Sequence, residues 1–74
     1  MKLTELSIGQ YAEIVNVDGE FSDRLLQLGF TQGEKIKIVQ RVLWGDPFIV
    51  DFRDCRLAMR KEEAECIHVQ IIKK

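Results

Sequence analysis

Three side chains in this 74-residue sequence are soft or imidazole metal ligands: Cys55, Cys66 and His68. Structural zinc sites usually draw roughly four ligands from pairs spaced roughly two to four residues apart, and the spacing C-x10-C-x-H does not match that arrangement. Cys55 shares the alternation of Leu57 and Met59, which predicts a position in the core, and His68 falls on the outward positions of its strand. The pattern therefore predicts structural or surface roles and no metal site.

Carboxylates in the second half of the chain are the next candidates for chemistry, either as iron ligands or as acid–base groups. They are Asp51, Asp54, Glu62, Glu63 and Glu65. Two of them are consecutive, and no apolar pocket or histidine base is signalled beside them, so we expect a solvated acidic face. One histidine and two separated cysteines supply no nucleophile, base and orienting group, and we expect neither an enzyme nor a bound cofactor.

Basic residues spread over the middle of the chain are candidates for nucleic-acid binding. They are Lys35, Lys37, Arg41, Arg53, Arg56 and Arg60. Nucleic-acid sites also use exposed aromatic rings, and Phe48 and Phe52 follow the alternation of core positions. The whole chain has 11 basic and 12 acidic residues, for a formal net charge of −1, so no excess of positive charge supports phosphate binding. We expect no nucleic-acid partner.

Length and composition indicate one domain over residues 1–74, with 46% hydrophobic residues to form its core. Two cysteines are too few for the disulfide framework of a small secreted domain, and the first residues do not read as a signal peptide. No apolar run approaches the roughly 18 residues that a membrane span needs. We expect a cytoplasmic protein that meets a membrane only through a partner.

Alternating apolar residues predict a mainly β protein. The expected strands are 11–17, 34–42, 48–53, 55–60 and 67–72, with a packed lead-in before the first strand and a single helical turn at 61–65. No βαβ alternation is present, so the strands favour a small antiparallel barrel.

One short α-helix of about two turns is predicted from residue 21, between the first and second strands. Its buried stripe is Phe21, Leu25 and Leu28, and Ser22 or Asp18 is the expected N-cap.

Glycine and proline mark the expected turns. Gly29 is placed to end the helix at positive φ, with Leu25 and Phe30 forming the hydrophobic pair of a Schellman ending. Gly33 suits the position of a type II turn over 31–34 that requires positive φ. Gly45 and Pro47 belong to the connection 43–47. Arg53 and Asp54 are the expected tip of a tight hairpin, but this tip lacks glycine, which leaves its register open and suggests a turn wider than usual.

Three apolar residues are candidates for a partner-facing surface: Leu26, Leu43 and Trp44. Leu26 lies about 100° around the helix from Leu25, outside the expected buried stripe. Trp44 is the only tryptophan and is expected at a loop tip, where a large ring can anchor a partner. The alternative is that Leu26 widens the buried face of the helix and Trp44 covers one end of the barrel.

The order of these elements and their punctuation resembles the FeoA family of small SH3-like barrels. The residues that carry the resemblance are Leu3, Leu6, Gly9, Ala12, Ile14, Arg24, Leu25, Leu28, Gly29, Gly33, Gly45, Asp46, Pro47, Leu57, Ala58, Met59, Arg60, Ala64 and Ile67. The sequence departs from the usual family pattern at Gln32, where proline is common, at Met59, where leucine is common, and at the glycine-free tip.

The resemblance implies a cytoplasmic accessory protein of ferrous-iron uptake that acts with FeoB, a membrane permease with a GTP-binding domain. The same fold also occurs as the C-terminal domain of metal-dependent repressors, so a metal-sensing or nucleic-acid-binding barrel is the alternative. A repressor would need a DNA-binding domain that these 74 residues do not contain, and we therefore expect the accessory protein. Self-association is left open.

Overall fold

The computed structural model describes residues 1–41 and 48–72. The elements, in chain order, are η1 (Leu3–Glu5), β1 (Tyr11–Val17), α1 (Ser22–Gln27), β2 (Lys35–Arg41), β3 (Phe48–Phe52), β4 (Cys55–Met59), α2 (Lys61–Ala64) and β5 (Ile67–Ile71). The connection that contains Leu43, Trp44, Gly45 and Pro47 lies outside the described residues, and the predictions made for those positions stay predictions.

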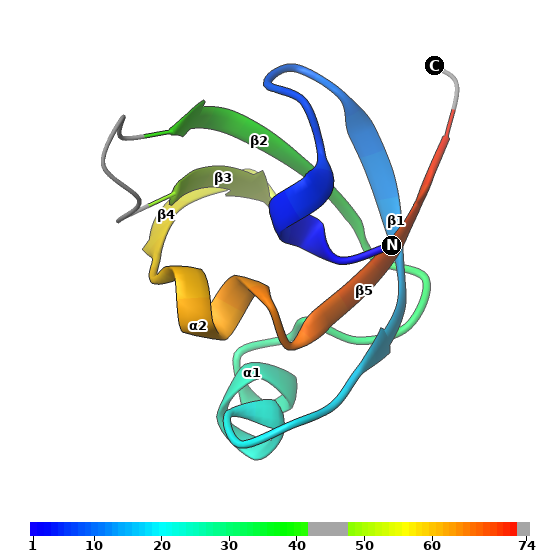
Figure 1. Cartoon of the computed structure of the whole chain (residues 1–74), viewed down its shortest axis with the longest axis vertical. Helices are drawn as coiled ribbons and strands as arrows, with labels where there is room; N and C mark the ends of the chain where they lie inside the picture. Colours follow the sequence, from blue (N-terminus) through cyan, green and yellow to red (C-terminus); the bar gives the residue numbers. More distant parts are fainter. Residues whose placement is uncertain (42–47, 73–74) are drawn as a thin grey trace.

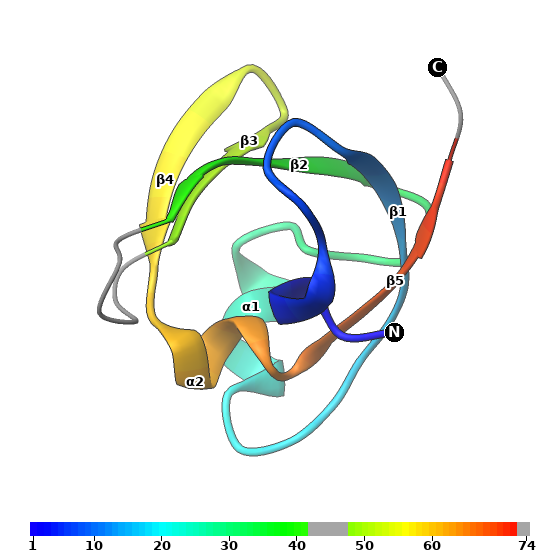
Figure 2. The same cartoon turned by 45° about the horizontal axis from the view of Figure 1, so that its top comes forward.

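All five strands join one antiparallel sheet in the order β4-β3-β2-β1-β5 (Figure 1). The sheet curls, so that α2 leads from one edge strand, β4, to the other, β5 (Figure 2). Helix α1 lies between β1 and β2 in the chain and at one end of the molecule (Figure 1). This arrangement confirms the predicted mainly β fold with a short helix after the first strand.

Two irregularities bend the sheet. The register between β1 and β5 shifts between Ile14 and Asn16, and the register between β2 and β3 shifts between Ile38 and Gln40. An extra residue on one strand increases the local twist and bends that strand. Both shifts therefore favour the curvature that wraps this sheet around its core.

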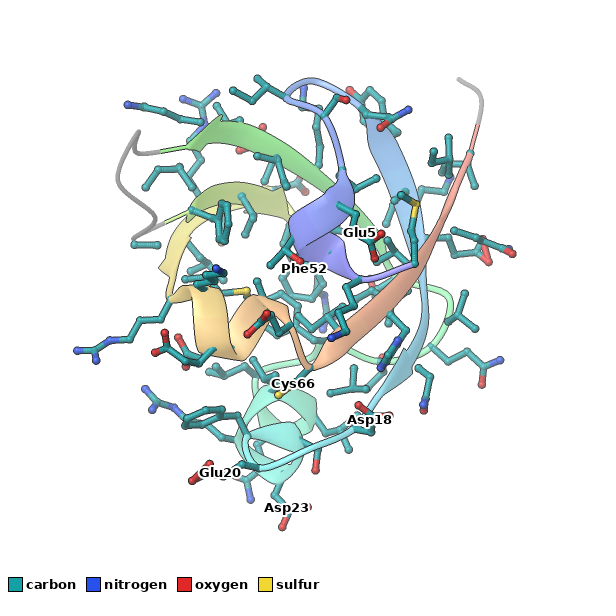
Figure 3. The ribbon with its side chains drawn as sticks, in the orientation of Figure 1. Glu5, Asp18, Glu20, Asp23, Phe52 and Cys66 are labelled. Atoms are coloured by element: carbon teal, nitrogen blue, oxygen red, sulfur yellow. The ribbon has the colours of Figure 1, made fainter. Side chains whose placement is uncertain are left out.

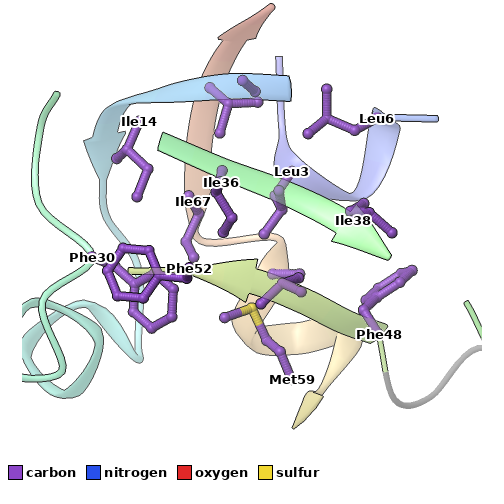
Figure 4. Packing of buried hydrophobic residues seen from close by; sticks show 14 of the residues in the cluster. Leu3, Leu6, Ile14, Phe30, Ile36, Ile38, Phe48, Phe52, Met59 and Ile67 are labelled. Atoms are coloured by element: carbon purple, nitrogen blue, oxygen red, sulfur yellow. The ribbon is translucent and has the colours of Figure 1, made fainter. Parts of the chain in front are cut away.

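The core lies inside this curved sheet, and η1, α1 and α2 also contribute side chains to it (Figure 4). Its fully buried large side chains are Leu3, Leu6, Ile14, Leu25, Phe30, Ile36, Ile38, Val50, Ile67 and Val69. No polar or charged residue of the described part of the chain is buried. The described interior is accordingly an apolar packing unit.

The C-terminal end of α1 is a Schellman motif, as predicted. The Phe30 N–H donates to the Leu25 carbonyl at 3.1 Å, and the Gly29 N–H donates to the Leu26 carbonyl at 3.0 Å. Gly29 has φ +103°, which a residue with a side chain adopts only with strain. Because Leu25 and Phe30 are both buried, the motif turns the chain straight into the core.

Two details of α1 were predicted wrongly. The N-cap is Phe21, without a side-chain hydrogen bond, because Ser22 is already the first helical residue and Asp18 lies too far upstream. Leu28 is 56% exposed instead of buried. The helix ends at Gln27, and the turn at Gly29 brings Phe30 into the core in place of Leu28.

The two turns that frame β2 and β3 are tight. Gly33 has φ +92°, and the Glu34 N–H donates to the Thr31 carbonyl at 3.1 Å, which confirms the predicted turn over 31–34. At the tip between β3 and β4, Arg53 and Asp54 have φ of 51° and 64°. Positive φ at both positions is typical of a two-residue type I′ hairpin. The predicted tight hairpin at Arg53 and Asp54 is confirmed, and the expectation that the lack of glycine would widen it was wrong.

Candidate docking surface

The C-terminal end of α1 is fixed against the tip of the β3–β4 hairpin. The rings of Phe30 and Phe52 stack with centroids 4.2 Å apart and an interplanar angle of 18°. Above them, the Arg53 guanidinium crosses Gly29 so closely that a Cβ atom built on Gly29 would lie 2.8 Å from Nη1. The last turn of α1 is therefore held from below by an aromatic pair and covered on one side by an arginine.

Leu26 lies in the last turn of α1 and is 43% exposed. Because successive helical residues are about 100° apart, burial of Leu25 turns Leu26 toward solvent. Leu26 thus does not widen the buried face of α1, and its predicted surface position is confirmed. The structure does not describe Leu43 and Trp44, so their assembly with Leu26 into one surface stays a prediction.

The three soft or imidazole ligands are not brought together. Cys55 is exposed on β4, although its alternation predicted a core position, because it directly adjoins the two-residue tip and only Met59 of β4 is buried. Cys66 is buried, and its thiol donates to the Glu62 carbonyl at 3.4 Å. His68 lies on β5, at the opposite edge of the sheet from Cys55.

A shallow hollow of ≈ 440 Å³ opens between the β1–α1 connection, α2 and β5. Carboxylates gather at this end of the molecule, where Asp18, Glu20 and Asp23 surround α1 below Cys66 (Figure 3). Asp18 is hydrogen-bonded to His68, with Nε2 and Oδ1 3.0 Å apart. Within residues 1–41 and 48–72, no three His, Cys, Asp or Glu side chains converge in a way that would hold a metal ion.

A second groove, of ≈ 580 Å³, crosses the outer face of β2, β3 and β4. Four of the predicted basic residues line it together with three carboxylates and a tyrosine: Lys35, Lys37, Arg53, Arg56, Glu34, Asp51, Asp54 and Tyr11. Phe48 and Phe52 are buried, as their alternation predicted. The face is mixed in charge, and those two rings are not available for stacking on a nucleobase.

Tyr11 is a groove residue that sequence reasoning missed. The Lys37 ammonium lies 4.8 Å from the centroid of the Tyr11 ring, and its Nζ donates to the Tyr11 hydroxyl at 3.4 Å. The two residues are direct cross-strand neighbours of β1 and β2. Alternation alone does not reveal this pair, because the register between the two strands must be known first.

The carboxylates singled out in the sequence separate into two groups. Asp51 pairs with Arg56 at 2.9 Å near the hairpin tip. Glu63 on α2 accepts the Arg60 N–H at 3.0 Å and lies 3.9 Å from the Arg24 guanidinium. These contacts are structural, and they place the two groups on different elements.

No helix in the described ranges is long and apolar enough to cross a membrane.

The curled sheet and its helical connection define a small SH3-like barrel. A zinc complex of FeoA from Stenotrophomonas maltophilia, described as a procaryotic SH3 domain protein, superposes with a TM-score of 0.85 at 30% identity over 95% of this chain and 89% of that one. A structure of ScaR with bound Cd2+ superposes with a TM-score of 0.80 over 95% of this chain and 35% of that one, but at 14% identity the likeness concerns the fold alone.

The FeoA domain model matches residues 1–71, and the chain belongs to this family. A putative Fe(2+) transport protein A of Campylobacter jejuni is 34% identical over 97% of this chain and 100% of its own length. A Porphyromonas gingivalis protein in which Fe(2+) transport protein A is fused to the Fe(2+) transporter FeoB is 38% identical over 97% of this chain, which spans only 9% of that fusion.

Proposed function

We propose that this chain is a cytoplasmic accessory protein of ferrous-iron uptake that binds the GTP-binding, cytoplasmic portion of a FeoB-type permease. The observation that carries the proposal is the Porphyromonas gingivalis fusion, which joins a domain 38% identical to this chain with FeoB in one polypeptide. Fusion holds two modules at high effective concentration, which benefits modules that bind one another.

The proposed action is binding without catalysis. The described interior is apolar, and among the described residues no three His, Cys, Asp or Glu side chains are grouped to hold a metal ion. A module of this kind alters its partner by binding one of the partner's conformations more tightly than another, which shifts the population toward the bound form.

Leu26 is the described residue that we propose as a contact with the permease, together with Leu43 and Trp44. An apolar side chain exposed on a rigid support gains free energy when a partner covers it, and it loses little conformational freedom in doing so. The Phe30–Phe52 stack beneath the end of α1 supplies that support.

The test is isothermal titration of the FeoB cytoplasmic portion with folded variants of this protein. Leu26→Gln retains good helix propensity, so a loss of binding reports the surface rather than the helix. We expect Leu26→Gln and Trp44→Gln each to weaken binding by about 1 kcal/mol or more, which is at least about fivefold in Kd.

Ile8→Gln is the matched control, because Ile8 is 58% exposed in the connection between η1 and β1, at the other end of the molecule from α1 (Figure 1). It should bind like the unmodified protein. Unchanged binding in both Leu26→Gln and Trp44→Gln would exclude this surface, and no binding by the unmodified protein would exclude the proposed partner.

The alternative of a metal-sensing or nucleic-acid-binding barrel makes different predictions. Equilibrium dialysis with ferrous iron under reducing conditions would show bound metal, and an oligonucleotide mobility assay would show a salt-dependent shift. Under the proposed function both assays give no saturable binding.

A further inference from the structure

Strand β4 lies at the edge of the sheet, with β3 as its only neighbouring strand among the described residues (Figure 2). The two-residue tip makes Phe52 and Cys55 a hydrogen-bonded pair, and such pairs alternate along an antiparallel ladder. The N–H and C=O groups of Arg56 and Ala58 therefore point away from β3. In the described part of the chain, no main-chain hydrogen bond from another segment reaches them.

The other edge of the sheet is covered in part. The Val69 N–H donates to the Met1 carbonyl at 2.7 Å, and Lys2 forms an isolated bridge with His68 on β5. An exposed sheet edge is a template for another strand unless a protein blocks it. The β4 edge, with exposed Arg56 and Ala58, is the more accessible template.

The side chains along this edge are predominantly basic. Residues 53–61 include Arg53, Arg56, Arg60 and Lys61 but only one carboxylate, Asp54. Arg56 and Arg60 are four residues apart, and Arg60 is still extended, with φ −75° and ψ 153°, so both lie on the same face of the strand. Arg56 contacts Asp51 while its side chain stays 68% exposed, and the five donors of a guanidinium leave room for a second carboxylate.

We propose that the β4 edge binds an extended acidic segment of a partner polypeptide as an added strand. The main chain of that segment pairs with Arg56 and Ala58. Two of its carboxylates, four residues apart, face Arg56 and Arg60, and the alternate apolar residues lie beside Leu57 and Met59. This inference deepens the proposed function and rests on it only for the identity of the polypeptide that carries the segment.

Charge favours an acidic segment over a second copy of this chain. Pairing β4 with itself would bring Arg56 and Arg60 of both copies to one seam, where like charges repel. The carboxylates of α2 come after the end of β4 in the chain and do not lie alongside the strand. One of them, Glu63, already contacts the Arg24 guanidinium and accepts the Arg60 N–H. They do not neutralise the middle of the edge.

The test uses a five-residue probe, acetyl-Glu-Val-Ser-Val-Glu-amide, and a control peptide with lysine at both ends. Amide hydrogen exchange of Arg56 and Ala58 is followed by NMR in the full protein. We expect both amides to exchange rapidly in the free protein and to become protected when the acidic probe binds. The lysine peptide should bind at least about tenfold more weakly.

Two variants separate the main-chain contribution from the charge contribution. Ala58→Pro removes the outward N–H donor at an edge position, where proline is tolerated, and should abolish probe binding, whereas Ala58→Val should retain it. Arg56→Gln with Arg60→Gln should reduce binding at least about tenfold in a protein that keeps the unmodified amide spectrum.

The proposal is overturned if the acidic probe and the lysine peptide bind equally, or if neither protects the two amides. Protection that rises with protein concentration in the absence of peptide would identify a second copy as the occupant and overturn it as well. Because this test contains no permease, a negative result would not bear on the proposal that Leu26 contacts the permease. Success of this test together with a failed permease titration would contradict only the proposed partner.

Discussion

The rings of Phe30 and Phe52 lie stacked, with centroids 4.2 Å apart, and join the end of α1 to the end of β3. Phe30 is 1% exposed and Phe52 is 4% exposed, so each ring also contributes hydrophobic burial. The pair connects segments more than twenty residues apart in the chain. The pair holds α1, which carries Leu26, against the hairpin that contains β4. Both proposed surfaces therefore depend on this pair.

We expect the stack to contribute about 0.5–1.5 kcal/mol beyond the burial of its two rings. The measurement is a double-mutant cycle of Phe30→Leu and Phe52→Leu by urea denaturation, in which each single variant should cost about 1–2 kcal/mol. A cycle of Phe30→Leu with Phe48→Leu is the control. Phe48 begins β3 and lies about 13 Å along the strand from Phe52, so its coupling to Phe30 should be near zero. Equal coupling in both cycles would contradict a specific role of the stack.

Gly33→Val should lower the free energy of unfolding by more than about 1 kcal/mol. The φ of +92° at Gly33 is unfavourable for a β-branched residue, and no atom lies within 4 Å of a Cβ built there. The cost should therefore come from backbone strain and not from a clash. Gly33→Ala, as the control, should cost less, and a thermal melt unchanged by both substitutions would contradict the turn.

Alternation predicted the strands because each strand has one face against the core, and Gly29 and Gly33 predicted turns because few other residues adopt positive φ. The same reasoning failed for Leu28 and Cys55. Their periodicity matches buried neighbours, but each lies where its element ends and the core no longer covers it. Where a helix or strand leaves the core depends on tertiary packing, which periodicity does not contain.

The candidate surfaces were predicted less completely than the fold. The exposure of Leu26 followed from its angle to Leu25, a local property of one helix. The free groups of Arg56 and Ala58 depend on the strand order and on the register set by the hairpin tip. Neither the strand order nor the register is encoded locally. A shift of the register by one residue would turn the other set of side chains outward.

Asp54→Gly should stabilise the protein by about 0.5 kcal/mol, because glycine adopts the positive φ of a type I′ turn without strain. Asp54 has φ 64° and is exposed, so little packing is lost. Asp54→Ala removes the same carboxylate without relieving strain and is the matched control. We expect the two variants to differ by about 1 kcal/mol in chemical denaturation, and equal stabilities would argue against a tight tip.

The two cysteines should react very differently with a thiol reagent such as Ellman's reagent. Cys55 is exposed, whereas Cys66 is 9% exposed and its thiol is hydrogen-bonded to the Glu62 carbonyl. In the native protein we expect one thiol to react promptly and the other at least about tenfold more slowly, since it must wait for local opening. Cys55→Ser should remove the prompt phase and Cys66→Ser the slow one. Denaturant should make both thiols of the unmodified protein react promptly, and two equally fast phases in the native state would contradict the burial of Cys66.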